Sequence, residues 1–247
     1  MSITKPAKNV VDFTSTKRRK PADGILLNES APFHVREAFK TIRTNLLFTL
    51  ATKTSKTVVV ASAMPNEGKS TTSVNLAMVL AQTGAQVLLM DCDLRKPSVH
   101  QFFKLPTNKG LTSILCGIDK IEDALHENVA PNLDVITAGP LSPNPSELLG
   151  STRMSDLLAI VQKAYDYVVL DASPLNIVSD AIIVAKQTAG VLLVIRHGSS
   201  RHDQLKKAIE SCEFAEVNIL GVIFNDSRTV NTNFYGYGHY KYSKDSV

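Results

Sequence analysis

The sequence predicts a doubly wound α/β domain with a mostly parallel sheet. Short runs rich in Val, Ile and Leu recur along the chain, and stretches with helical periodicity lie between them. The short runs are apolar almost throughout, which is typical of strands that helices cover on both faces. The predicted strands span residues 57–62, 86–91, 133–139, 167–173, 190–196 and 218–225.

An amphipathic helix is expected at about 34–51, before the first strand. Apolar residues recur there at intervals of three or four, the spacing of one helix face, at Val35, Phe39, Ile42, Leu46 and Leu50. Because this helix precedes the first strand, its apolar face can pack on the sheet. Further helices are expected at 69–83, 151–164, 178–188 and 201–213.

The composition favours one globular domain with polar ends. The chain has 247 residues and 44% hydrophobic content, which suits a single domain with an ordinary core. We divide it into a flexible N-terminal arm at 1–30, a folded domain at 31–226 and a flexible tail at 227–247. The net charge of +4 is mild, and the basic run at 17–20 has no aromatic partners. We therefore expect a solvated arm and no nucleic-acid partner.

The sequence argues against several other classes of protein. Its three cysteines have no metal-like spacing, which disfavours zinc and iron–sulfur sites. No apolar segment follows the charged N-terminus as in a secretory leader, and the longest apolar run, 189–195, is too short to span a bilayer. We expect a reduced, soluble and cytoplasmic protein that another protein would have to recruit to a membrane.

A phosphate-binding loop is predicted between the first strand and the next helix, in ASAMPNEGKSTT at 61–72. Gly68, Lys69 and Ser70 match the second half of a P-loop, while Ala63 stands where the general motif has its first glycine. The loop amides and the helix N-terminus would form a cradle for phosphates. Lys69 would neutralise the β- and γ-phosphates of a nucleotide, and the Ser70 hydroxyl would bind Mg²⁺.

Carboxylates follow two further strands. Asp91 and Asp93 leave the second strand in VLLMDCDLRKP, and Asp171 ends the strand in YVVLDASP, the form of a Walker B motif. Acids at a buried strand end are unfavourable unless a cation or a reacting proton is present. Asp171 would therefore hold Mg²⁺ opposite Ser70. For Asp93, pairing with Arg95 in a capped loop is an alternative.

These groups together predict phosphoryl transfer, which needs positioned phosphates, charge neutralisation and a base that orients the acceptor. Asp91 is the candidate base, because the metal is expected to occupy Asp171. Asn225, at the end of the last strand, is either an adenine contact or a turn residue. The predicted catalytic residues are Lys69, Asp91, Asp93 and Asp171, and the predicted metal ligands are Ser70, Asp91 and Asp171. The predicted nucleotide contacts are Glu67, Gly68, Lys69, Ser70, Thr71 and Asn225.

The C-terminal stretch NFYGYGHYKYS at 233–243 holds four of the six tyrosines. A buried tyrosine contributes apolar area and needs a partner for its hydroxyl, and a tail rich in Gly, His and Lys provides neither. The two glycines between the tyrosines would leave the segment flexible enough to enter a cleft. This pattern raises the question of whether the phenols are substrates.

In these motifs the chain resembles the bacterial tyrosine kinases (BY-kinases) of capsule and exopolysaccharide synthesis, from about Pro32 to the tail. SAMPNEGKS resembles their Walker A loop, whose first glycine is often replaced. LLMDCDLRKP resembles the Walker A′ motif that distinguishes the family, and VVLDASP resembles its Walker B motif. The resemblance implies a P-loop NTPase fold, ATP and Mg²⁺ as cofactors, and non-specific protein-tyrosine kinase activity.

The resemblance also assigns roles to individual residues. Asp91 would be the acid–base residue and a metal contact, Asp93 would support it, and Asp171 would complete the metal site. The acceptors, phosphorylated between subunits, would be Tyr235, Tyr237, Tyr240 and Tyr242. EAFKTIR at 37–43 resembles an oligomerisation motif, Glu-x-x-Arg-x-x-Arg, whose positions here are Glu37, Lys40 and Arg43. Lys40 replaces the middle Arg and loses its bidentate geometry.

The resemblance implies partners as well. Family members without membrane helices work with a separate transmembrane activator of the polysaccharide co-polymerase type. We therefore expect recruitment to the inner face of the plasma membrane by such an activator. We also expect a homo-oligomer, which a ring would satisfy, and other protein tyrosine substrates.

Two other functions remain open. A membrane-linked switch ATPase of the MinD/ParA kind shares the fold and the acid after the second strand. However, its loop carries a signature Lys where this chain has Met64, and it has no use for a tyrosine tail. A scaffold that uses ATP only to hold its shape is the second alternative, and the presence of Lys69, Asp91 and Asp171 argues against it.

Overall fold

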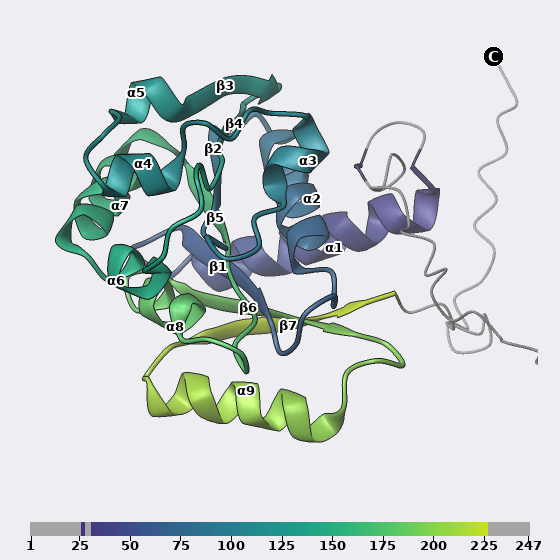
Figure 1. The fold of residues 1–247 in the computed structure, drawn as a ribbon. Coiled ribbons are helices and arrows are strands. Elements are labelled where there is room, and N and C mark those ends of the chain that lie inside the picture. Colours follow the sequence, from purple (N-terminus) through teal and green to yellow (C-terminus); the bar gives the residue numbers. More distant parts are fainter. Residues whose placement is uncertain (1–25, 28–30, 227–247) are drawn as a thin grey trace, which may run out of the picture.

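The structure of the protein is a computed structural model that describes residues 26–27 and 31–226. Most of the predicted arm, including the basic run at 17–20, lies outside the described residues. The predicted tail also lies outside them, with Tyr235, Tyr237, Tyr240 and Tyr242. The described part forms one sheet between layers of helices (Figure 1), which confirms the predicted fold class.

Most strands of the sheet are parallel and buried. They are β1 (Thr57–Ser62), β2 (Val87–Asp91), β3 (Leu125–Ala130), β4 (Leu133–Ile136), β5 (Tyr167–Asp171), β6 (Gly190–Arg196) and β7 (Ile219–Asn225). Within the described residues their order is β3-β4-β2-β5-β1-β6-β7, and only β3 pairs antiparallel. The central strands are buried along nearly their whole length, which explains their continuous apolar sequence.

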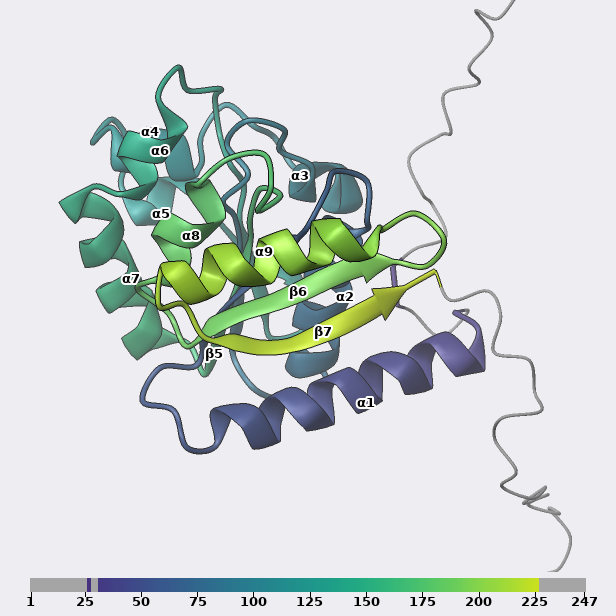
Figure 2. The same cartoon turned by 90° about the horizontal axis from the view of Figure 1, so that it is seen from below.

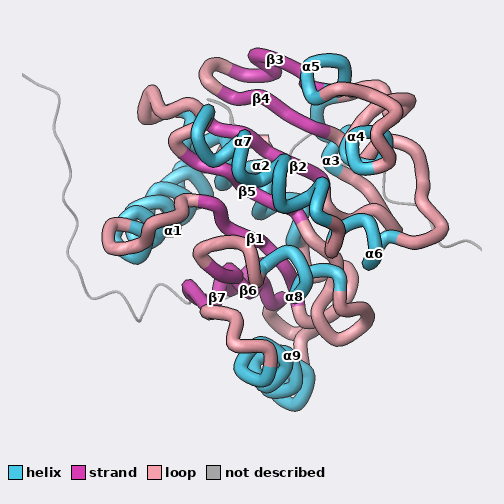
Figure 3. The backbone as a smooth tube through the Cα atoms, turned by 90° about the vertical axis from the view of Figure 1, so that its left-hand side faces the viewer, coloured by secondary structure: helices cyan, strands magenta, loops and turns pink. Residues whose placement is uncertain are grey.

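Helices cover both faces of the sheet (Figures 1 and 3). They are α1 (Phe33–Leu50), α2 (Lys69–Ala81), α3 (Val99–Phe103), α4 (Leu111–Leu115), α5 (Ile121–Ala124), α6 (Pro145–Leu149), α7 (Thr152–Ala164), α8 (Asp180–Ala185) and α9 (His202–Phe214). On one face, α1, α2 and α3 pack in a cluster that includes Val58 and Val60 of β1. On the other face, α4 and α6 to α9 pack in a second cluster that includes Val59.

The sequence prediction missed one strand and several short helices. β3 has the sequence LHENVA, which is only partly buried and has no apolar run because it lies at the antiparallel edge. The helices α3 to α6 have four or five residues each, too few for a helical period to show. The strands predicted at 133–139 and 167–173 end earlier, at Ile136 and Asp171, because their last residues belong to loops.

The strand order brings the predicted site residues to one edge of the sheet. β2 pairs with β5 in a register that places Asp91 beside Asp171. β1 pairs with β5 on its other side, with Val60 beside Asp171, so the loop that follows β1 begins near both acids. In open α/β sheets this carboxyl edge is where ligands bind.

The N-terminal helix α1 packs on the domain as its periodicity predicts. Leu46 and Leu50 are each 2% exposed and belong to the same apolar cluster as α2. Arg43 also contacts α2, because its Nη1 donates to the Val79 carbonyl at 3.0 Å. None of the helices in the described ranges, α1 with its 18 residues included, has the length and apolar character that crossing a membrane requires.

Leu46→Ala should lower the free energy of unfolding by about 2–5 kcal/mol, because it leaves a cavity between α1 and the sheet. Phe48→Ala on the same helix is the matched control: Phe48 is 76% exposed, and its loss should change stability by less than about 0.5 kcal/mol. Urea unfolding followed by circular dichroism measures both. Equal effects of the two substitutions would show that α1 is not part of the core.

Candidate functional site

The predicted P-loop joins β1 to α2 and turns sharply at Gly68. Gly68 precedes α2 with a φ of 93°, a left-handed conformation that favours glycine. A Cβ atom on Gly68 would lie 2.0 Å from Nδ2 of Asn225. Glycine is therefore required both by its backbone angle and by the close approach of Asn225.

The buried side chain of Glu67 stabilises the conformation of the P-loop. It was predicted to contact the nucleotide, yet its side chain is buried inside the domain, where only 1% of the residue is exposed. Its carboxylate accepts the backbone N–H of Met64 at 2.8 Å and the hydroxyl of Ser200. The structure therefore gives the Glu67 side chain a role in holding the loop.

Asn225 also holds the loop. Its Nδ2 donates to the Glu67 carbonyl at 2.9 Å, and its Oδ1 accepts the backbone N–H of Asp226 at 2.9 Å. The sequence left open whether Asn225 is an adenine contact or a turn residue, and neither alternative included this contact with the P-loop. Asp226 has a φ of 55°, so the chain does turn directly after Asn225.

Lys69 lies among the strand-end acids. Its Nζ is 2.8 Å from Asp93 Oδ2 and 3.6 Å from Asp171 Oδ2, and it donates to Ser70 Oγ at 3.1 Å. Burial by itself would lower the pKa of Lys69, but the charges of Asp171, Asp93 and Asp91 outweigh it and hold the pKa above its ordinary value. Lys69 is therefore a fixed positive charge at the base of the loop.

Asp91 is fully buried and orders the turn after β2. Its Oδ1 accepts the N–H of Asp93 at 3.1 Å, and its Oδ2 accepts those of Ser98 and Val99 at 3.0 Å each. Burial and the nearby charge of Asp171 raise the pKa of Asp91 to about 8, although the backbone donors and Lys69 favour its ionised form. Asp91 is thus a carboxyl group that can change its protonation near neutral pH.

Asp171 has one oxygen without a hydrogen bond. Its Oδ1 accepts the Ser73 hydroxyl at 3.0 Å, whereas its buried Oδ2 accepts no hydrogen bond among the described residues and lies 3.6 Å from the Lys69 ammonium. Burial raises the pKa of Asp171, and the charge of Lys69 opposes that rise. A buried carboxylate oxygen whose one ion-pair partner lies at 3.6 Å and which accepts no hydrogen bond fits a site for a further cation.

Asp93 pairs with Lys69, so the predicted alternative of an Asp93–Arg95 pair is wrong. Asp93 Oδ1 also accepts the Ser173 hydroxyl at 2.9 Å and the Lys96 N–H at 3.1 Å. Arg95 instead binds the buried Asp180, with 2.7 Å between Nε and Oδ2. Asp180 lies 85 positions further along the chain, so the sequence offered no signal for this partner.

A cavity of about 580 Å³ opens over the P-loop. Lys69, Ser70, Thr71 and Asp93 line its polar side. Its apolar side and rim include Leu26, Phe102, Pro174, Ile177 and Val178. This volume lies within the range of small-molecule sites, about 300–1,000 Å³, and the polar groups converge where phosphates would bind.

The donor set fits Mg²⁺ held together with a nucleotide. No cluster of three or more His, Cys, Asp or Glu side chains in the described residues could hold a metal alone. Mg²⁺ usually takes one or two carboxylates and completes its shell with substrate phosphates and water. Asp171 and the Ser70 hydroxyl, which lines the cavity, are suitable ligands of that kind.

The predicted oligomerisation residues lie on α1. Lys40 Nζ pairs with Glu37 Oε1 at 2.7 Å, one helical turn away. Arg43 donates to Val79 near the carboxyl end of α2, where helix carbonyls lack partners and a cation is favoured. Arg43 thus has an intramolecular role, and the oligomerisation role of the three residues stays a prediction.

Comparison with known proteins identifies first the class and then the family. A family model described as an AAA domain matches residues 51–214, which agrees with the P-loop ATPase fold. The tyrosine-protein kinase YwqD of Bacillus subtilis is 43% identical over 201 residues, which cover 81% of this chain and 85% of YwqD. The kinase domain of the Escherichia coli tyrosine kinase ETK is 35% identical, with a TM-score of 0.76 over 82% of this chain and 80% of that domain.

The chain belongs to the bacterial tyrosine-protein kinases, as its three motifs predicted. Its enzyme class is that of a protein-tyrosine kinase with a nucleotide-binding P-loop fold. The septum site-determining protein MinD of Pyrococcus horikoshii, solved with Mg-ADP, is 22% identical with a TM-score of 0.59 over 68% of this chain and 69% of MinD. That likeness shows a shared fold alone.

The pKa of Asp91 should make its effect on stability depend on pH. Its ordinary pKa is 3.8 and its folded pKa is about 8, so between these values the folded chain keeps a proton that the unfolded chain loses. The stability that Asp91 contributes therefore falls as pH rises, by at most about 1.4 kcal/mol per pH unit. Asp91→Asn cannot titrate, so its free energy of unfolding minus that of the wild type should increase with pH.

Denaturant unfolding of both proteins without nucleotide or divalent cation, at about pH 5 and about pH 7.5, measures this difference. Comparing the two proteins cancels the titration of all other groups to a first approximation. A difference that is the same at both pH values would mean that Asp91 is ionised throughout.

Proposed function

We propose that this protein is an ATP-dependent tyrosine kinase that phosphorylates its own C-terminal tyrosines between subunits and regulates capsule or exopolysaccharide synthesis. The observation that carries the proposal is the position of Lys69. This lysine of the P-loop lies between Asp93 and Asp171, near the carboxyl ends of the adjacent parallel strands β2 and β5. Membership of the tyrosine-protein kinases supports the reaction type.

Different residues of the site have different proposed roles in phosphoryl transfer. The amides from Gly68 to Thr71 and the Lys69 ammonium bind the phosphates and orient them. Ser70, Asp171 and Asp91 would hold Mg²⁺, and the ion would neutralise charge on the phosphates. The apolar side of the cavity, at Phe102 and Ile177, suits the ring of an acceptor tyrosine.

The two aspartates that follow β2 have different proposed roles. Asp91 is the proposed base by resemblance to the family; it is fully buried, and Asp93, two residues further on, lines the cavity. Asp93 supports it: Asp93 lines the cavity and fixes Lys69. As the phenol gives its proton to Asp91, its oxygen would bond to the γ-phosphorus of ATP, the bond from that phosphorus to the bridging β–γ oxygen would break, and ADP would leave.

The partners are proposed from the family resemblance and from the sequence. A separate transmembrane activator would recruit the kinase from the cytoplasm to the inner face of the plasma membrane. Glu37, Lys40 and Arg43 of α1 would contribute to a homo-oligomer in which one subunit receives the tail of its neighbour. Tyr235, Tyr237, Tyr240 and Tyr242 are the proposed acceptors.

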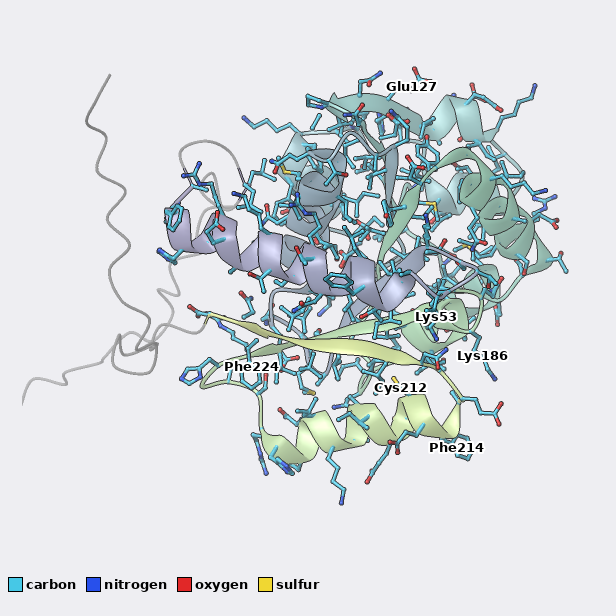
Figure 4. The ribbon with its side chains drawn as sticks, turned by 180° about the vertical axis from the view of Figure 1, so that it is seen from behind. Lys53, Glu127, Lys186, Cys212, Phe214 and Phe224 are labelled. Atoms are coloured by element: carbon cyan, nitrogen blue, oxygen red, sulfur yellow. The ribbon has the colours of Figure 1, made fainter. Side chains whose placement is uncertain are left out.

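The first experiment is to incubate the full chain with Mg²⁺ and ATP and to map phosphate by mass spectrometry. We expect phosphate on the tail tyrosines, and a loss of about 100-fold or more in both variants: Lys69→Met removes the charge that binds the phosphates, and Asp91→Asn removes the proposed base. Lys186→Met is the matched control: this exposed lysine, labelled in Figure 4, follows α8 and lies near the opposite edge of the sheet.

A second sample should carry the cytoplasmic segment of the activator as a fusion, because the proposed activator is expected to raise the activity of the kinase. ATP hydrolysis with an unmodified tail, even in the fusion, would favour the MinD/ParA-like switch ATPase. Nucleotide binding with neither reaction, and no response to Asp91→Asn, would favour a scaffold.

Phosphorylation of the tail should loosen the oligomer. Each phosphotyrosine adds a charge of about −1.5 to −2, and several of them would crowd the ends of neighbouring subunits. Size-exclusion chromatography should show a smaller species for the phosphorylated protein than for the same protein after phosphatase treatment. Identical elution of the two forms would contradict this expectation.

A further inference from the structure

Asn225 and Asp226, which we call the tail root, lie beside the P-loop. β6 and β7 run side by side at the edge of the sheet (Figure 2), with Arg196 paired to Asn225 at their carboxyl ends. The His197 N–H donates to the Asn225 carbonyl at 3.0 Å and continues this pairing by one step. Asn225 and Asp226 are the last described residues, so the tail begins directly from this point.

Arg196 links the tail root to the loop. Its Nε and Nη2 lie 3.1 Å and 2.7 Å from Asp226 Oδ2, and its Nη1 donates to the Asn66 carbonyl at 3.4 Å. A guanidinium presents several donors in a fixed plane, so one side chain can hold both partners at once. Arg196 therefore ties the first residue after β7 to the middle of the P-loop.

Asn225 makes a second link to the same loop. Its Nδ2 donates to the Glu67 carbonyl, the next carbonyl along from the one that Arg196 contacts. Two consecutive loop carbonyls are thus held by side chains at the ends of β6 and β7. We call Arg196, Asn225 and Asp226 the tail clamp.

The clamp acts on the part of the loop whose conformation is unusual. Asn66 and Gly68 both have positive φ, at 67° and 93°, on either side of Glu67. Alternating turns of this kind point successive amides toward an anion and leave the carbonyls facing away. The clamp holds those carbonyls, so the same peptide groups connect the phosphate cradle to the tail root.

We propose that Arg196 is a positioning residue that couples nucleotide occupancy of the P-loop to the order of the tail root. A nucleotide that fixes the loop amides also fixes the carbonyls that the clamp binds, and thereby restrains Asp226. Coupling between two sites is reciprocal, so the clamp strengthens nucleotide binding by the same factor. The inference rests only on the nucleotide-binding part of the proposed function and not on tyrosine phosphorylation.

The alternative is that the Arg196–Asp226 ion pair is only a surface contact and does not couple the loop to the tail root. The Arg196 and Asp226 side chains are 31% and 26% exposed, and ion pairs of that kind often add little to stability. Such a pair would leave both the nucleotide affinity and the response of the tail to nucleotide unchanged when it is removed. The two measurements below separate these cases.

Trypsin provides the test, because Arg228 is two residues beyond Asp226. The full chain is digested with and without saturating Mg-ADP, and cleavage after Arg228 is timed by mass spectrometry against the cuts at 17–20, which serve as an internal reference. We expect ADP to slow cleavage at Arg228 by about five-fold or more, the lower range of ordinary allosteric coupling. The affinity for a fluorescent ADP analogue is measured in parallel.

Arg196→Gln should abolish the protection by ADP and weaken ADP binding by the same factor. Asp226→Asn leaves the contact between Arg196 and Asn66 in place and removes the Arg196–Asp226 ion pair, so ADP should no longer protect Arg228 in this variant. This second variant keeps the proposal testable should Arg196→Gln fold poorly. Arg201→Gln is the matched control: this arginine pairs with Asp203 on the surface, and its loss should change neither readout.

Cleavage at Arg228 that does not respond to ADP in the wild type would overturn the proposal. So would full protection in both Arg196→Gln and Asp226→Asn. Since neither readout involves phosphate transfer, a failure here is distinct from a failure to detect kinase activity.

Discussion

The burial of Lys69 among Asp91, Asp93 and Asp171 is the interaction on which the rest of the site depends. All three acids are nearly inaccessible to solvent, at 0%, 3% and 0% exposure. Buried carboxylates destabilise a fold unless they are paired or hydrogen-bonded. Lys69 is their only cation in reach among the salt bridges of the described residues, and backbone and serine donors supply the remaining contacts. The excess of negative charge explains why the site is suited to a further cation.

The site has two sides with different physical roles. The side that faces the cavity carries Lys69, Ser70 and Asp93, and it is where ligands can be reached. The side behind the loop carries Glu67, Asn225 and Arg196, which hold the loop through its own amides and carbonyls. Glycine at position 68 allows the two sides to approach so closely, because any side chain there would meet Asn225. The shape of the phosphate cradle is thus maintained by residues that need not touch phosphate.

Much of the fold and part of the site could be predicted from the sequence. The central strands are continuous apolar runs, and the acids and the Gly-Lys-Ser segment follow them directly, so local pattern was sufficient. The half-exposed strand β3 and the short helices carried too little periodicity to be recognised. Glu67 was predicted to contact the nucleotide from its place in the P-loop motif. That motif gives no sign that the side chain points inward to Ser200, 133 positions away.

The sequence by itself determined the fold class, the P-loop and the family, because these depend on residue types at short, fixed spacings. Only the tertiary structure decided the partners of the charged groups. Lys69 pairs with Asp93, Arg95 with Asp180, and Arg196 with Asp226. The physical reason is that a charge pairs with whichever group the strand order brings within a few ångströms, and strand order is a property of the whole sheet. Asp93 therefore pairs with Lys69, 24 positions earlier in the chain, and not with the nearby Arg95.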